Sequence, residues 1–173
     1  MENQASSKSI ILNYGLYLGI IGVITHLCLF ATGQLLELNW INSLVWFIAL
    51  IIFTVLGIKK FKTSSGGFMS WGKGLKIGMG ITMICAVITV VYILLFLNVI
   101  DPEFQNHAIE LQKQAWVDAG MTSDQIESSL EVMEMFQGPV ISSALILAFS
   151  AFIGFIITAI ISAVMKQNAE EQY

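Results

Sequence analysis

Four long stretches without a charged residue constrain this chain more than any other feature of its sequence. No Asp, Glu, Lys or Arg occurs for 28 residues after Lys8, 21 after Glu37, 24 after Lys76 and 31 after Glu134. A helix needs about 20 mainly apolar residues to cross the hydrocarbon core of a bilayer, because it rises about 1.5 Å per residue. Each stretch is long enough, and the pattern predicts four membrane spans.

The overall composition agrees with this prediction. Hydrophobic residues make up 56% of the chain and charged residues 12%, whereas soluble domains carry about 25% charged residues. A chain this small cannot hide so much apolar surface inside a globule. The spans must be helices, since unpaired backbone groups in lipid are costly and the runs lack the alternation of barrel strands. The predicted fold class is therefore all-α, an integral membrane four-helix bundle.

Turn and cap signals place the boundaries of these elements. We predict spans over about 10–32, 40–58, 71–98 and 140–165. Between the last two, Asp101 and Pro102 resemble a helix start, Gly120 a helix end, and Thr122 with Gln125 a capping box. The segment 101–138 is thus predicted to be a helical hairpin, inserted between the third and fourth spans of a single membrane domain over 1–173.

The distribution of lysines sets the expected orientation. The stretch 59–76 holds five lysines and no acid, whereas 101–134 holds eight acids and one lysine. Basic residues are enriched in cytoplasmic loops close to the membrane. We therefore expect both termini in the cytoplasm and the hairpin on the extracytoplasmic side. The lysines of the inner loop are expected to meet anionic lipid headgroups; they are Lys59, Lys60, Lys62, Lys73 and Lys76.

Each predicted hairpin helix carries an apolar stripe at helical spacing. The stripes consist of Phe104, Ala108, Leu111 and Ala115 in the first helix, and Ile126, Leu130 and Met133 in the second. They are expected to pack on each other or on the bilayer surface. The hairpin is also acidic, which makes it the part of the chain most suited to an interaction.

Few residues suggest chemistry. His26 is the one residue with a near-neutral pKa inside a span, and groups of this kind at membrane depth are functional candidates. We prefer a structural role, in which neighbouring hydroxyls satisfy the imidazole. No charged residue at that depth completes a proton relay. Glu103, His107 and Glu110 share one helix face and are weak candidates for a metal site. A solvated helix face is the simpler interpretation, and we expect no bound metal and no cofactor.

Small residues recur four apart in three of the spans. Such stripes let helix backbones approach closely, within one bundle or between copies of a chain. We interpret them as packing positions; they are Gly15, Gly19, Gly74, Gly78, Ser150, Gly154, Thr158 and Ser162. The glycines after Trp71 do not form a phosphate loop, because no Gly-Lys-Ser/Thr ending follows them.

Three segments carry a family resemblance. They are the run from Gly66 to Gly78, the run from Ile100 to Phe104, and the run from Gly120 to Glu127. In this order and flanked by these spans, they resemble the bacterial domain-of-unknown-function family 4199 (DUF4199), over about residues 9–166. The resemblance implies a small four-span protein of a bacterial inner membrane. It implies no activity and transfers no functional residue.

Two functions remain open at this point. The first is a non-catalytic scaffold or accessory subunit, whose acidic hairpin binds a membrane or periplasmic protein partner. The second is a small transporter or channel, formed by homo-oligomerisation, for an uncharged or weakly polar solute. An enzyme ranks last and is not expected, because only His26 and His107 are candidates for activated groups. No feature suggests nucleic-acid binding.

Overall fold

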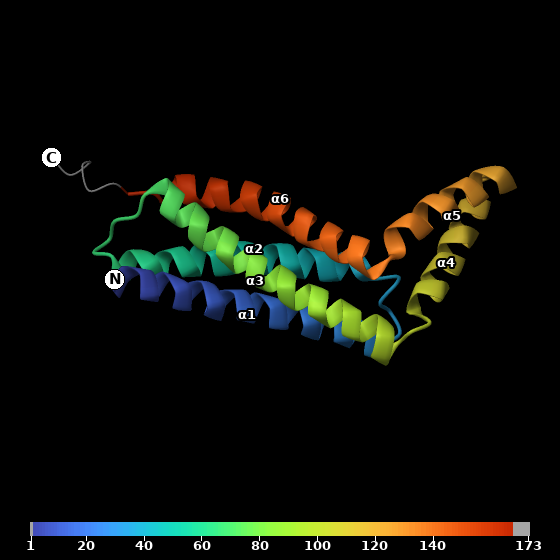
Figure 1. Ribbon diagram of the computed structural model, residues 1–173, viewed down its shortest axis with the longest axis horizontal. Coiled ribbons are helices and arrows are strands. Elements are labelled where there is room, and N and C mark those ends of the chain that lie inside the picture. Colours follow the sequence, from blue (N-terminus) through green and yellow to red (C-terminus); the bar gives the residue numbers. More distant parts are fainter. Residues whose placement is uncertain (1, 168–173) are drawn as a thin grey trace. The chain divides into compact units, whose positions relative to one another are not determined.

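The computed structural model describes residues 2–167, and these residues are helical apart from turns and one isolated bridge between Met69 and Gln167 (Figure 1). The helices are α1 (Glu2–Ala31), α2 (Asn39–Ser64), α3 (Trp71–Leu95), the π-helix η1 (Phe96–Ile100), α4 (Phe104–Asp118), α5 (Ser123–Gln137) and α6 (Pro139–Met165). Four helical segments are long and apolar enough to cross a membrane: Ser7–Ala31, Asn39–Ser64, Trp71–Ile100 and Pro139–Met165. The predicted all-α fold with four spanning helices is confirmed.

The chain divides into two compact units. One comprises the residues up to Thr89 together with those from Leu147 onward, and the other is Val90–Ile146. We call the first unit the four-span bundle, because it holds α1, α2 and most of α3 and α6. The second unit contains η1, α4 and α5 with the adjoining ends of α3 and α6; we call residues 101–138 of this unit the hairpin.

Helix α3 contacts each of the other three spanning helices. Its residue Gly78 is so close to α6 that an added Cβ would lie 2.5 Å from Thr158 Cγ2 and 3.0 Å from Thr54 Cγ2 of α2. On another face of α3, Ile84 lies where a Cβ on Gly15 of α1 would sit, at 2.6 Å. Helices this close leave no room for larger side chains at these positions.

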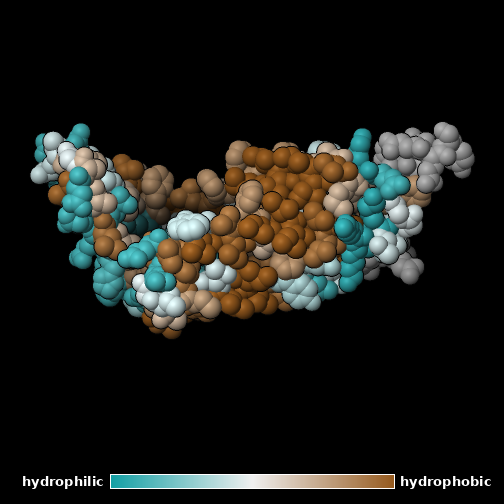
Figure 2. Space-filling view, turned by 180° about the vertical axis from the view of Figure 1, so that it is seen from behind, coloured by the Kyte–Doolittle hydropathy of each residue, from teal (hydrophilic) through white to brown (hydrophobic). Residues whose placement is uncertain are grey.

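Large apolar side chains cover the outside of the bundle. Phe149, Phe152 and Val164 of α6 are 70%, 63% and 80% exposed, while Thr54, Thr82 and Thr158 are fully buried. Figure 2 shows the resulting hydrophobic surface over the long helices. A water-soluble bundle carries charged and polar residues on its outer face instead. Surface of this kind needs lipid, which agrees with the four spans.

Two predicted boundaries differ from the structure. Helix α1 begins at Glu2, eight residues before the predicted start of the first span. Helix α2 continues to Ser64, so Lys59, Lys60 and Lys62 belong to its last turns and the loop begins only at Ser65. Lysine is a good helix former and stabilises a helix C-terminus. The lysines that end the apolar run of the second span therefore do not end the helix.

The turn signals of the hairpin are largely confirmed. Thr122 Oγ1 accepts a hydrogen bond from the Gln125 backbone N–H at 3.4 Å, and the Gln125 side chain accepts one from Thr122 N at 2.9 Å. Gly120 has a φ of +79° at the end of α4, a conformation that favours glycine. The predicted cap at Asp101 is wrong: Glu103 occupies the N-cap position of α4, because the π-helical hydrogen bond from Asp101 N to Phe96 O holds Asp101 in the preceding turn.

Candidate functional site

The start of α4 is fixed by a short column of aromatic rings. Phe96 of η1 is fully buried. Its ring lies 6.0 Å from that of Tyr92 and 5.3 Å from that of Phe104, the latter in an edge-to-face arrangement. Such pairs contribute beyond the area that they bury. The column therefore anchors the first turn of α4 to the end of α3 and positions the residues that follow.

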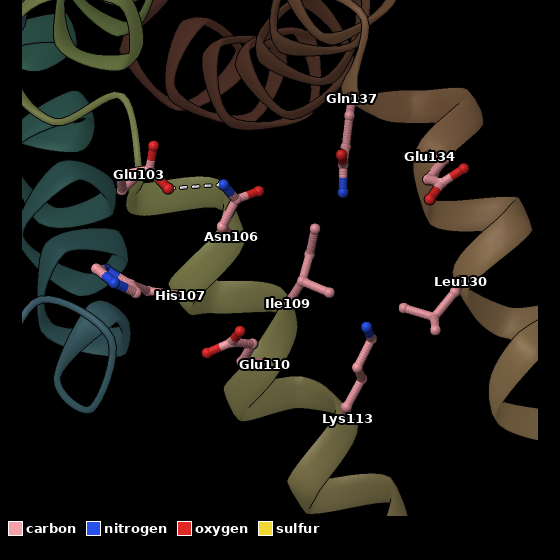
Figure 3. Close-up of a pocket in the computed structure, with 9 residues that line it drawn as sticks. All are labelled: Glu103, Asn106, His107, Ile109, Glu110, Lys113, Leu130, Glu134 and Gln137. Atoms are coloured by element: carbon pink, nitrogen blue, oxygen red, sulfur yellow. Dashed lines mark hydrogen bonds between the residues drawn. The ribbon is translucent and has the colours of Figure 1, made fainter. Parts of the chain in front are cut away.

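A cleft of about 430 Å³ opens between α4 and α5 (Figure 3). It is lined by Glu103, Asn106, His107, Ile109, Glu110, Lys113, Leu130, Glu134 and Gln137. Figure 3 shows Ile109, Lys113 and Leu130 pointing into the space between the two helices, with the Gln137 amide entering it from the end of α5. The cleft thus combines two apolar side chains with amides, carboxylates and one ammonium group.

The predicted metal candidates line this cleft without forming a metal site. Glu103 accepts a hydrogen bond from Asn106 Nδ2 at 2.8 Å, and the His107 and Glu110 side chains do not converge with it on one point (Figure 3). Among the residues that the structure describes, no group of three or more His, Cys, Asp or Glu side chains is arranged to hold a metal ion.

Only part of the apolar stripe predicted for α4 is shielded from solvent. Leu111 is 57% exposed and Ala115 is also exposed, whereas Ile109 and Trp116, outside the predicted stripe, are half-buried. In α5 the predicted residues Ile126, Leu130 and Met133 are all half-buried. Neither helix contains a fully buried residue. The hairpin therefore has no core of its own.

Five cleft residues were not singled out by the sequence. They are Asn106, Ile109 and Lys113 of α4, and Glu134 and Gln137 of α5. Their signal was available: on α4 the lining residues recur three or four apart, which places them on one side of the helix.

The five lysines of residues 59–76 divide into two groups. Lys59, Lys60 and Lys76 are exposed. Lys62 donates to Met165 O at 3.2 Å and to Gln167 Oε1 at 3.1 Å, and Lys73 Nζ lies 5.3 Å from the ring centroid of Phe61. Lys62 and Lys73 therefore stabilise the bundle itself, while binding of lipid headgroups by the five stays a prediction.

The small residues of the spans lie mostly at helix contacts. A Cβ on Gly19 would meet Ile88 of α3, one on Gly74 would meet Ser162, and one on Gly154 would meet Thr82. Ser150 is half-buried on α6. Thr54 Oγ1 and Ser162 Oγ are buried without a hydrogen-bond partner. The seam between α2, α3 and α6 is thus both tightly packed and polar.

His26 is half-buried on α1 and is not an unpaired group. The hydroxyl of the neighbouring Thr25 donates to Ile21 O at 2.9 Å. Cys28 is exposed and Cys85 is buried, and both are free thiols. None of these residues lines the cleft, so the site candidates of the spans and of the hairpin are separate sets.

Four long apolar helices around a polar, small-residue seam define a polytopic α-helical membrane protein. The profile of the family described as "Protein of unknown function (DUF4199)" matches residues 13–167, nearly the whole chain. The chain belongs to this family. Comparisons with curated proteins and with solved structures gave no significant match.

Proposed function

We propose that this protein is a non-catalytic scaffold or accessory subunit of a bacterial inner membrane, which binds a protein partner through the acidic cleft of its hairpin. One observation carries the proposal: α4 and α5 bury no residue completely and hold a cleft lined by carboxylates and apolar side chains. A segment with this composition gains little stability from its own packing, and a partner with Lys or Arg beside an apolar anchor would complement it.

The proposed orientation places the hairpin in the periplasm and both termini in the cytoplasm. The asymmetry of lysines and acids around the spans supports it. In a variant with Cys28→Ser and Cys85→Ala, a cysteine at Gln112 should react with a membrane-impermeant thiol reagent in intact spheroplasts, and one at Ser64 should react only after lysis. Reaction at Ser64 before lysis, with protection at Gln112, would reverse the topology.

Site-specific photo-crosslinking tests the partner. A photoreactive residue at Ile109 or Leu130, inside the cleft, should give discrete adducts in native membranes, and one at the exposed Ser128 should not. Changing Glu103, Glu110 and Glu134 to Gln should reduce the adducts severalfold. Changing Glu127 and Glu131 to Gln, outside the cleft, serves as the matched control. Equal adducts at Ser128, or adducts indifferent to the cleft charges, would contradict the proposal.

A transporter or channel for an uncharged or weakly polar solute is the second candidate. The buried, unpartnered hydroxyls of Thr54 and Ser162 favour it, because transporters place polar groups at membrane depth. The close contacts of Gly74 and Gly78 in the same seam oppose a path through one chain. Purified protein in vesicles should distinguish the two: solute-specific swelling that Thr54→Val abolishes would support transport over the scaffold.

A further inference from the structure

Helix α5 carries three different faces. Ile126, Leu130 and Met133 form the half-buried face described above. At 100° per residue, Glu127, Glu131 and Glu134 form a second, acidic face. The third is exposed and apolar: Val132 is 53%, Met135 66% and Phe136 50% exposed. We call these three residues the α5 apolar face. No described helix covers it.

Residues that face lipid follow the α5 apolar face directly in the chain. Helix α6 follows after only Gly138, and its first residues include Val140, 79% exposed, and Ile141, 46% exposed. Aliphatic side chains this exposed on a spanning helix contact the bilayer. Met135 and Phe136 precede Val140 by only five and four residues. Exposed apolar side chains therefore follow one another along the chain from the end of α5 into the span.

Chain length keeps this face close to the bilayer interface. Phe136 precedes Val140 by four residues, so their Cα atoms lie within about 13 Å of each other however the chain turns at Gly138. The headgroup region on each side of the hydrocarbon core is about 5–7 Å thick, so an α5 that leans toward the surface brings Phe136 into it. Gly138 has a φ of −57° and a ψ of 137°, which ends the helix and lets the chain change direction there. An α5 that lies along the surface brings Val132 to the same depth.

We propose that the last two turns of α5 dock in the lipid interface on the hairpin side of the membrane, through Val132, Met135 and Phe136. The acidic face then stays in water, because it lies about 120° around the helix from the apolar one. Interfacial helices commonly carry Lys or Arg for anionic lipids. Here the polar face is acidic, so zwitterionic lipid is the matching surface and anionic lipid opposes docking.

Docking of this kind needs only a weak intrinsic affinity. Both ends of the hairpin continue into spanning helices, so α5 is held at the surface at a high effective concentration. The inference does not depend on the proposed protein partner, which would occupy the cleft and not the α5 apolar face. It assigns one face of the hairpin to lipid and leaves the acidic cleft free.

Spin-label accessibility in phosphatidylcholine vesicles tests the proposal. On the full chain with Cys28→Ser and Cys85→Ala, single labels are placed at Met135 and Phe136, with Glu127 and Glu131 of the same helix as matched controls. Val140 serves as the lipid reference. The ratio of oxygen to nickel-chelate collisions should be severalfold higher at Met135 and Phe136 than at the two glutamates, and should approach the ratio at Val140.

Two results would overturn the inference. Ratios at Met135 and Phe136 equal to those at the glutamates would mean that α5 projects into water. Labels shielded from both reagents would mean that protein, such as a second copy of the chain, covers the face. As a second measurement, a label at Val132 should shift toward water when Met135 and Phe136 are changed to Gln; circular dichroism verifies that the variant remains helical.

Discussion

The four-span bundle and the hairpin are both α-helical, yet they bury their side chains very differently. In the bundle, Leu18, Leu50, Ile58, Ile77 and Ile81 are fully buried and glycines hold the helices together. Helices α4 and α5 contain no buried residue and meet across an open cleft. The bundle therefore holds its shape through packing, whereas the hairpin depends on its caps and on the spanning helices that it joins.

The largest effect should come from filling the closest helix contact. Gly78→Leu places a side chain where even a Cβ would lie 2.5 Å from Thr158. We expect a loss of more than about 3 kcal/mol, enough to prevent assembly of the bundle. Titration with SDS in mixed micelles measures the loss. Gly72→Leu is the matched control, since no atom lies within 4 Å of a Cβ at Gly72. Equal loss in both variants would mean that this contact does not hold the bundle.

Truncation of one aliphatic residue in each region sharpens the comparison. Ile77→Ala in the fully buried core of α3 should cost about 3 kcal/mol. Leu130→Ala in the hairpin should cost about 1 kcal/mol or less, because Leu130 is only half-buried. The same unfolding titration compares the two. A cost for Leu130→Ala as large as that for Ile77→Ala would show that the hairpin has a core after all.

The smallest expected effect concerns the lysines. Lys62→Met removes two hydrogen bonds, to Met165 O and Gln167 Oε1, and should cost about 1 kcal/mol. Lys60→Met removes the same charge from an exposed position of the same helix and should leave the unfolding midpoint unchanged. If the two variants behave alike, the contribution of Lys62 is its charge near the membrane and not its contacts.

The sequence predicted the helices well and their contacts less well. Charge-free stretches located all four spans, because a bilayer imposes a minimum apolar length. The π-helical turn at Phe96–Ile100 has no comparable signature in the sequence. Helix α4 offers two apolar strips, one through Leu111 and one through Ile109 and Trp116, and periodicity alone does not decide which of them faces α5. The cleft depends on that choice, so its lining was only partly predicted.

The large apolar side chains on the outside of the bundle and the small residues at its helix contacts have different roles. Phe149, Phe152 and Val164 give α6 the hydrophobicity that inserts it into a membrane, but they specify no partner helix. The closest contacts between the spanning helices lie instead at small residues, such as Gly78 against Thr158. Replacing those three residues by leucine should preserve the fold. Exchanging Gly78 with the residue next to it in the sequence should disrupt the fold. In this protein, membrane insertion depends on how much apolar surface a helix carries, whereas assembly of the bundle depends on where its small residues lie.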